Sequence, residues 1–115
     1  MQVFFLVLSK TECLEPLLEK LLECGAHGAT ILESTGMMRV LDQRGDDAPM
    51  FGALRHLFDP ERRSSKTLMM VLEDEQAEKV RSIVNEVTGG LDKPDTGVMF
   101  AVPALYVEGM EGCRQ

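Results

Sequence analysis

The chain has 115 residues and a formal net charge of −7, which is the size of one domain that can bury a hydrophobic core. Nucleic-acid binding requires a clustered basic surface, and 12 lysines and arginines against 19 acidic residues exclude nucleic acid as an expected partner. The three cysteines lack metal-ligand spacing, and the apolar run near the N-terminus is too short for a signal peptide or a membrane span. We therefore expect one domain over residues 1–108, a flexible tail over 109–115, a cytoplasmic location and no direct membrane insertion.

The first segment predicts a strand followed by a helix. Val3 to Leu8 is a continuous apolar run that is typical of a central strand. The helix should begin near Leu14, because Pro16 is tolerated only in a first helical turn, and Gly25 stands where a left-handed cap would end it. The leucines expected on its apolar face are Leu14, Leu17, Leu18, Leu21 and Leu22.

A second strand, Ala29 to Leu41, is expected to be interrupted or bent at Gly36, and a long insert, Asp42 to Ser65, follows it. A connection of this length between strands is usually functional or disordered. Apolar residues at helical spacing in its centre predict a short amphipathic helix. Two interpretations stay open: this helix packs on its own domain, or the insert is a recognition loop that contacts a partner protein. The expected partner-binding residues are Phe51, Leu54, Leu57, Phe58, Arg62 and Arg63.

The second half repeats this order of elements. Lys66 to Leu72 predicts a strand, Asp74 is expected to cap a helix, and Gly89 is expected to end that helix. Val98 to Val102 predicts a fourth strand, which Pro103 ends or places at an edge of the sheet. The apolar face of the second helix is expected to contain Ala77, Val80, Ile83, Val84 and Val87.

Two strand-helix-strand units in tandem predict an α+β, ferredoxin-like βαββαβ fold with both helices on one face of the sheet. The first and third strands, which are the most apolar, should be central. Alternate side chains of these strands are apolar on both faces, and two helices cover only one face. The second face must be buried by the insert or by other subunits, and we predict a homo-oligomer.

Three segments carry a resemblance to a known family: STG at Ser34 to Gly36, VLEDEQAEKVRSIVNEVTGG at Val71 to Gly90, and VMFAVP at Val98 to Pro103. With a long loop between the second and third strands, the chain resembles the P-II nitrogen-regulatory signalling family over nearly its whole length. The resemblance implies a homotrimeric signal transduction protein without catalytic activity, with ligand clefts between subunits. It also implies a membrane transporter or a metabolic enzyme as the regulated partner.

In that family the long loop, called the T-loop, contacts the partner, while its base and the loop after the second helix hold an adenine nucleotide. Here the insert Asp42 to Ser65 corresponds to the T-loop. Glycines in the second loop would let the backbone approach a ligand closely, and their amides are suited to an anion. The implied ligand-binding residues are Gly36, Met37, Met38, Arg39, Thr88, Gly89, Gly90 and Lys93.

The chain departs from the family pattern at its basic residues. Val98 stands where a phosphate-binding lysine is expected, the C-terminal stretch lacks closely spaced arginines, and the only tyrosine, Tyr106, lies outside the insert. Charge-assisted contacts are the strong ones at phosphate sites, so triphosphate binding should be weakened, with Arg39 and Lys93 as partial replacements. A less charged adenine nucleotide and another anion both stay open as ligand.

The sequence offers little support for a metal site or a catalytic centre. His27, His56 and the cysteines are scattered, although CutA-like proteins share a related fold and form trimers, so a CutA-like metal-binding or structural trimer is the alternative. No nucleophile, base and orienting group fall together in a recognisable motif, and we do not expect an enzyme.

Overall fold

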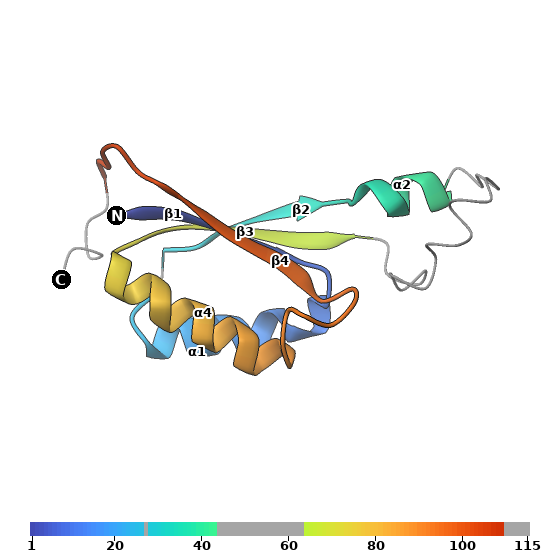
Figure 1. Ribbon diagram of the computed structural model, residues 1–115, viewed down its shortest axis with the longest axis horizontal. Helices are drawn as coiled ribbons and strands as arrows, with labels where there is room; N and C mark the ends of the chain where they lie inside the picture. The colour runs from blue at the N-terminus through green and yellow to red at the C-terminus, as the bar shows by residue number, and fades with distance from the viewer. Residues whose placement is uncertain (27, 44–63, 110–115) are drawn as a thin grey trace.

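The computed structural model describes residues 1–26, 28–43 and 64–109, and these form a four-stranded antiparallel sheet with two helices packed on one face (Figure 1). The strand order is β2-β3-β1-β4, which is the ferredoxin-like βαββαβ arrangement. The elements in chain order are β1 (Gln2–Leu8), η1 (Thr11–Cys13), α1 (Leu14–Glu23), β2 (Thr30–Ser34), α2 (Met37–Gln43), β3 (Ser65–Leu72), α4 (Asp74–Thr88) and β4 (Gly97–Pro103).

The predicted centre of the sheet is confirmed, because β1 pairs antiparallel with both β3 and β4. Phe5 of β1 lies opposite Met69 of β3 on one side and Phe100 of β4 on the other. The strand β2 pairs only with β3, so β2 and β4 are the edges of the sheet formed by the described strands. Pro103 ends β4, where its missing N–H removes no central hydrogen bond.

The predicted second strand is wrong beyond Ser34. The strand β2 stops there, and Met37–Gln43 forms the helix α2, whose first turn is closed by a hydrogen bond of 3.1 Å from the Val40 amide to the Gly36 carbonyl. Ser34 pairs with Ser65, the first residue of β3, so no further residue of β3 remains to extend the ladder. Backbone groups that lose a strand partner are satisfied within the chain by a helix.

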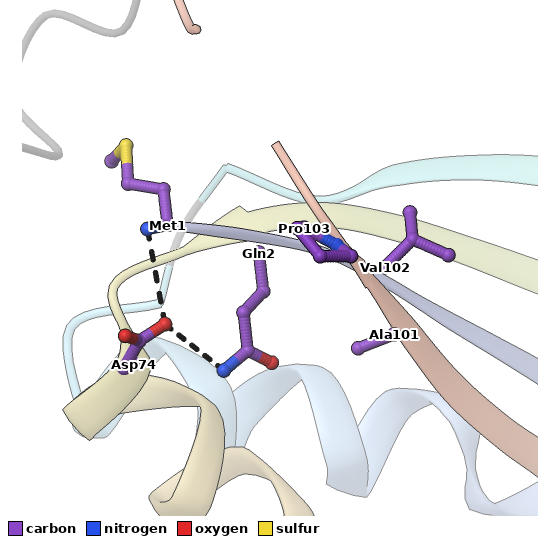
Figure 2. Close-up of a pocket in the computed structure, with 6 residues that line it drawn as sticks. All are labelled: Met1, Gln2, Asp74, Ala101, Val102 and Pro103. Atoms are coloured by element: carbon purple, nitrogen blue, oxygen red, sulfur yellow. Dashed lines mark hydrogen bonds and ion pairs between the residues drawn. The ribbon is translucent and has the colours of Figure 1, made fainter. Parts of the chain in front are cut away.

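The helix ends follow the sequence closely, with one exception. The helix α1 begins at Leu14, and Gly25 (φ +89°) and Gly89 (φ +84°) adopt the expected left-handed conformation after α1 and α4. Asp74 is not the cap of α4, because the N-cap is Glu73, which makes no capping bond to the first turn through its side chain. Asp74 instead accepts a hydrogen bond of 3.0 Å from Gln2 Nε2 and lies 3.8 Å from the N-terminal ammonium (Figure 2).

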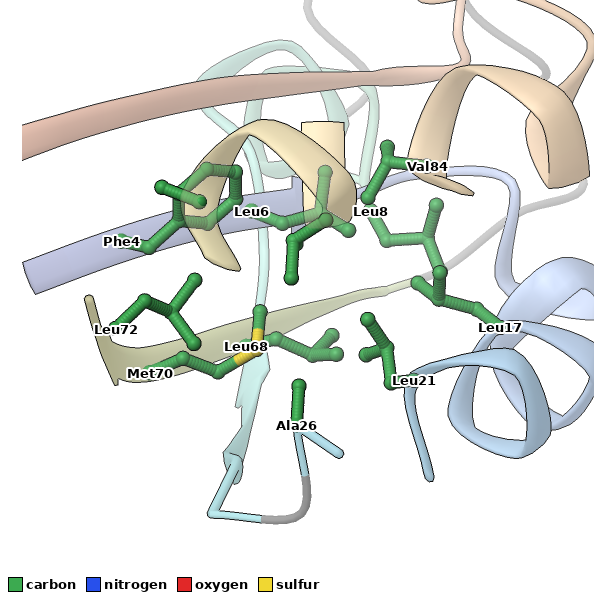
Figure 3. Packing of buried hydrophobic residues seen from close by; sticks show 12 residues of the cluster. Phe4, Leu6, Leu8, Leu17, Leu21, Ala26, Leu68, Met70, Leu72 and Val84 are labelled. Carbon is green, nitrogen blue, oxygen red and sulfur yellow. The ribbon is translucent and has the colours of Figure 1, made fainter. Parts of the chain in front are cut away.

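The core lies between the helices and the inner face of the sheet (Figure 3). The inner face contributes Phe4, Leu6 and Leu8 of β1, and both helices add residues at the predicted spacing. One predicted core residue, Leu22, is 66% exposed, because it lies a further 100° around α1 from the buried Leu21. The other buried members are Leu17, Leu21, Ala26, Leu68, Met70, Leu72, Ala77, Val80 and Val84.

The outer face of the sheet is apolar except at the corner formed by Ser34, Ser65 and Thr67, and no described helix covers it (Figure 1). Phe5 and Phe100 stack there with ring centroids 5.0 Å apart, and Val98 and Phe100 are 61% and 49% exposed. The most exposed large apolar residues of the outer face are Leu32, Val98, Phe100 and Val102.

Candidate functional site

A pocket of about 270 Å³ lies where the helix α2 meets the loop between α4 and β4. It brings together two segments that are far apart in the sequence, the base of the insert and residues 93–98, with Ser9 from the end of β1. Five of the eight predicted ligand-binding residues line this pocket: Gly36, Met37, Met38, Arg39 and Lys93. The remaining lining residues are Ser9, Asp95, Thr96, Gly97 and Val98.

A buried ion pair crosses this site. Arg39 Nη2 on α2 lies 2.6 Å from Asp95 Oδ1, and the two side chains are 8% and 11% exposed. A buried pair is costly to break, because removing one partner leaves an uncompensated charge away from water. The pair therefore holds α2 against the loop that leads into β4.

Asp95 was not predicted from the sequence as a site residue. It stands in PDTG, and an aspartate in such a stretch is an ordinary turn residue. Its left-handed backbone (φ +53°) fits that role, since Asp tolerates this region better than most residues. No local pattern indicates that its carboxylate meets a guanidinium 56 positions away.

The loop that carries Asp95 is anchored to the end of β1. The buried Thr96 accepts hydrogen bonds at its carbonyl from the amides of Ser9 (3.0 Å) and Lys10 (3.1 Å). Gly97 follows, where β4 approaches β1 so closely that a Cβ would lie 2.7 Å from the Val7 carbonyl oxygen. These contacts fix the floor of the pocket without using the Arg39–Asp95 pair.

Two lysines lie at the carboxyl end of α4. Lys10 Nζ donates a hydrogen bond of 3.1 Å to the Thr88 carbonyl, and Lys93 Nζ lies 3.7 Å from the position that a Cβ on Gly89 would occupy. A helix carboxyl end carries partial negative charge, so both ammonium groups are favourably placed there. Of the two, Lys93 lines the pocket.

The other three predicted ligand-binding residues, Thr88, Gly89 and Gly90, do not line this pocket. Thr88 is buried, and its hydroxyl donates to the Val84 carbonyl (2.7 Å) and accepts from the Gly90 amide (3.3 Å). In this structure these residues shape the turn that positions Lys93.

The neck of the insert contains a hydroxyl cluster that the sequence did not reveal. Ser34 Oγ lies 2.8 Å from both Ser65 Oγ and Thr67 Oγ1, across the β2–β3 ladder. Ser65 is buried, and its hydroxyl also donates to the Ser34 carbonyl at 3.2 Å. The cluster fixes where the chain leaves the sheet, one turn before α2.

Several predicted residues lie outside the described residues. These include every predicted partner-binding residue of the insert, both histidines, and the tail apart from Gly109. Within the described ranges there is no group of three or more His, Cys, Asp or Glu side chains suited to a metal ion, and no helix is long and apolar enough to cross a membrane. The residues concerned in the insert are Phe51, Leu54, Leu57, Phe58, Arg62 and Arg63.

A second pocket of about 400 Å³ lies at the opposite end of β1, beside the start of α4 (Figure 2). Its charged groups are the Asp74 carboxylate and the N-terminal ammonium, which already interact with each other. It contains none of the predicted ligand-binding residues, so the pocket at Arg39 is the candidate site.

No protein-family model matches this chain, and no curated protein matches it significantly. The P-II resemblance therefore stays a prediction that rests on the quoted motifs.

Proposed function

We propose that this protein is a non-enzymatic, P-II-like regulatory protein that senses a small anionic ligand and acts on a partner protein through the insert at residues 42–65. The observation that carries the proposal is the pocket that joins the base of this insert to the loop before β4. A ligand in that pocket would contact both segments at once. It would therefore shift the insert to the extent that its affinity differs between two arrangements of α2.

The lining of the pocket supports an adenine nucleotide as the first ligand to test. Lys93 supplies an ammonium for a phosphate, and Met37 and Met38 supply adaptable apolar surface for a planar base. Met37 is 73% exposed, so a bound base would remove apolar surface from water.

The exposed outer face of the sheet supports assembly of the chain with copies of itself. A contiguous apolar surface of this kind is unusual on a soluble monomer. We propose the homotrimer that the P-II resemblance implies, with the outer faces of the sheets turned toward one another. Light scattering at micromolar concentration would test this directly, and a well-behaved monomer would contradict it.

The partner and the location rest on the resemblance alone. A membrane transporter or a metabolic enzyme is the proposed partner, and the cytoplasm is the proposed location. Arg62 and Arg63 would engage acidic groups of that partner, so exchanging both for alanine should abolish capture of the partner while leaving assembly unchanged.

Calorimetric titration with ATP, ADP, AMP and cyclic nucleotides tests the ligand, with bicarbonate and oxoglutarate as co-ligands. We expect saturable binding at about one site per chain and a loss of about tenfold in affinity in Lys93→Gln, as for one charge-assisted contact. Lys79→Gln is the matched control, because Lys79 is an exposed lysine of α4 that does not line the pocket. Absence of binding at millimolar ligand would contradict the proposal, and stoichiometric zinc or copper in the sample would favour the CutA-like alternative.

A further inference from the structure

The charge of the candidate pocket is lower than its basic residues indicate. Among the described residues that line it, three side chains are charged: Arg39, Lys93 and Asp95. Arg39 and Asp95 form the 2.6 Å ion pair, so their charges cancel within the site. The net charge of these three side chains is therefore +1, and Lys93 is the cation outside the Arg39–Asp95 pair.

We propose that Asp95 determines the charge specificity of this pocket: by holding Arg39, it makes the pocket prefer a ligand with a single negative charge over a polyphosphate. This inference rests on the proposed function in one respect, which is that the pocket takes an anionic ligand. It adds the class of anion and the residue that selects it.

The position of the carboxylate explains the selection. A polyphosphate that extends from Lys93 toward Arg39 must compete with a buried carboxylate and place its own charges beside it. Both effects are unfavourable, and the second grows with each charge on the ligand. A monoanion can bind through one ion pair with Lys93, which is an exposed residue of the lining.

The surroundings of Asp95 favour a role in the pocket over a purely structural one. The loop is already anchored through the Thr96 carbonyl to the amides of Ser9 and Lys10. The ion pair adds a charged group to the lining at the point where the loop meets α2. If the pair served only to hold the loop, its removal would weaken the binding of all anions alike.

The test uses probes that share one chemistry and differ in charge: inorganic phosphate, pyrophosphate and tripolyphosphate at pH 6, where inorganic phosphate is mostly a monoanion, at constant ionic strength and without divalent cations. The full-length protein is compared with Asp95→Asn, which keeps an acceptor oxygen for Arg39 and removes the charge. We expect the affinity of the variant to rise by about three- to tenfold for each unit of ligand charge within roughly 6 Å of residue 95 in this partly hydrated site. Tripolyphosphate then becomes the preferred probe.

Asp92→Asn is the matched control, because it makes the same change in charge in the same loop at an exposed residue that does not line the pocket. It should leave the order of preference as in the unmodified protein. A second variant, Arg39→Gln combined with Asp95→Asn, preserves the net charge of the lining. It should bind phosphate within about threefold of the unmodified protein, because the paired Arg39 contributes little net charge there.

An unchanged order of preference in Asp95→Asn, equal weakening of all three probes, or no binding of any probe to that variant would overturn the inference. If Asp95→Asn does not fold, the double variant decides: loss of its phosphate binding would show that Arg39 binds the anion directly and would also overturn the inference. The nucleotide titration is read separately. If adenine nucleotides do not bind but the polyphosphate series behaves as expected, the nucleotide part of the proposed function fails and the role of Asp95 stands.

Discussion

The two faces of the sheet are similar in sequence and opposite in environment. On the inner face Leu6 is fully buried under the helices, while on the outer face Phe100 is 49% exposed. Both faces are built by alternate apolar residues of the same strands. An apolar pattern thus predicts that a strand face is buried somewhere, but it does not identify what covers that face.

The largest effect is expected on the inner face. Leu6→Ala should lower the free energy of unfolding by about 2–5 kcal/mol, because it removes buried methyl groups and leaves a cavity. Chemical denaturation followed by circular dichroism measures this loss. Val98→Ala on the outer face is the comparison, and the same loss there at a concentration where the protein is monomeric would contradict the distinction between the two faces.

A charge on the outer face should act on assembly instead of folding. If the proposed homotrimer forms through the outer face, we expect Phe100→Glu to weaken self-association by about hundredfold, roughly 3 kcal/mol, because the interface would have to bury an unpaired carboxylate. Analytical ultracentrifugation measures the change. Lys79→Glu, an exposed change on α4, serves as control, and an unchanged assembly in Phe100→Glu would show that the outer face is not the interface.

A smaller effect is expected at the polar corner of the outer face. Ser34→Ala removes a hydroxyl that bridges Ser65 and Thr67, and should cost about 1 kcal/mol of stability. Thermal unfolding measures this cost, and hydrogen exchange at the amides of α2 reports whether the helix at the neck loosens. Ser82→Ala on the exposed face of α4 is the control. An equal loss of stability in that variant would show that the hydroxyl cluster makes no specific contribution.

The smallest effect is expected at Leu22, which the helical pattern places in the core although it is largely exposed. Leu22→Gln should change the free energy of unfolding by no more than about 0.5 kcal/mol, as for most surface substitutions. Denaturation of this variant beside Leu21→Gln, at a buried neighbour, provides the measurement. A loss of unfolding free energy at Leu22 as large as that at Leu21 would show that the buried face of α1 includes Leu22.

The P-II resemblance implied eight ligand-binding residues, and that these residues bind a ligand stays a prediction. Five of the residues that it implied do line one pocket, including Arg39 and Lys93. The resemblance did not indicate Asp95, because the loop that carries it departs from the family pattern. The ion pair consequently changes the expected role of Arg39, from an open replacement for lost basic residues to a group held by a neighbouring carboxylate.

The sequence by itself determined the features that depend on neighbouring residues. Continuous apolar runs specified the strands β1 and β3, and helical spacing with Gly25 and Gly89 specified the two core helices and their ends. The repeat of these elements was enough to predict the topology of the sheet.

Only the tertiary structure decided the features that depend on partners distant in the chain. The strand β2 ends at Ser34, which pairs with Ser65 at the start of β3, and the segment that follows β2 forms the helix α2. The pairing of Arg39 with Asp95 likewise exists only once the sheet has brought α2 beside the loop before β4. The backbone groups of a strand need hydrogen-bond partners, and a buried charge needs an opposite charge. In both cases the partner lies far away in the sequence and comes close only when the chain folds.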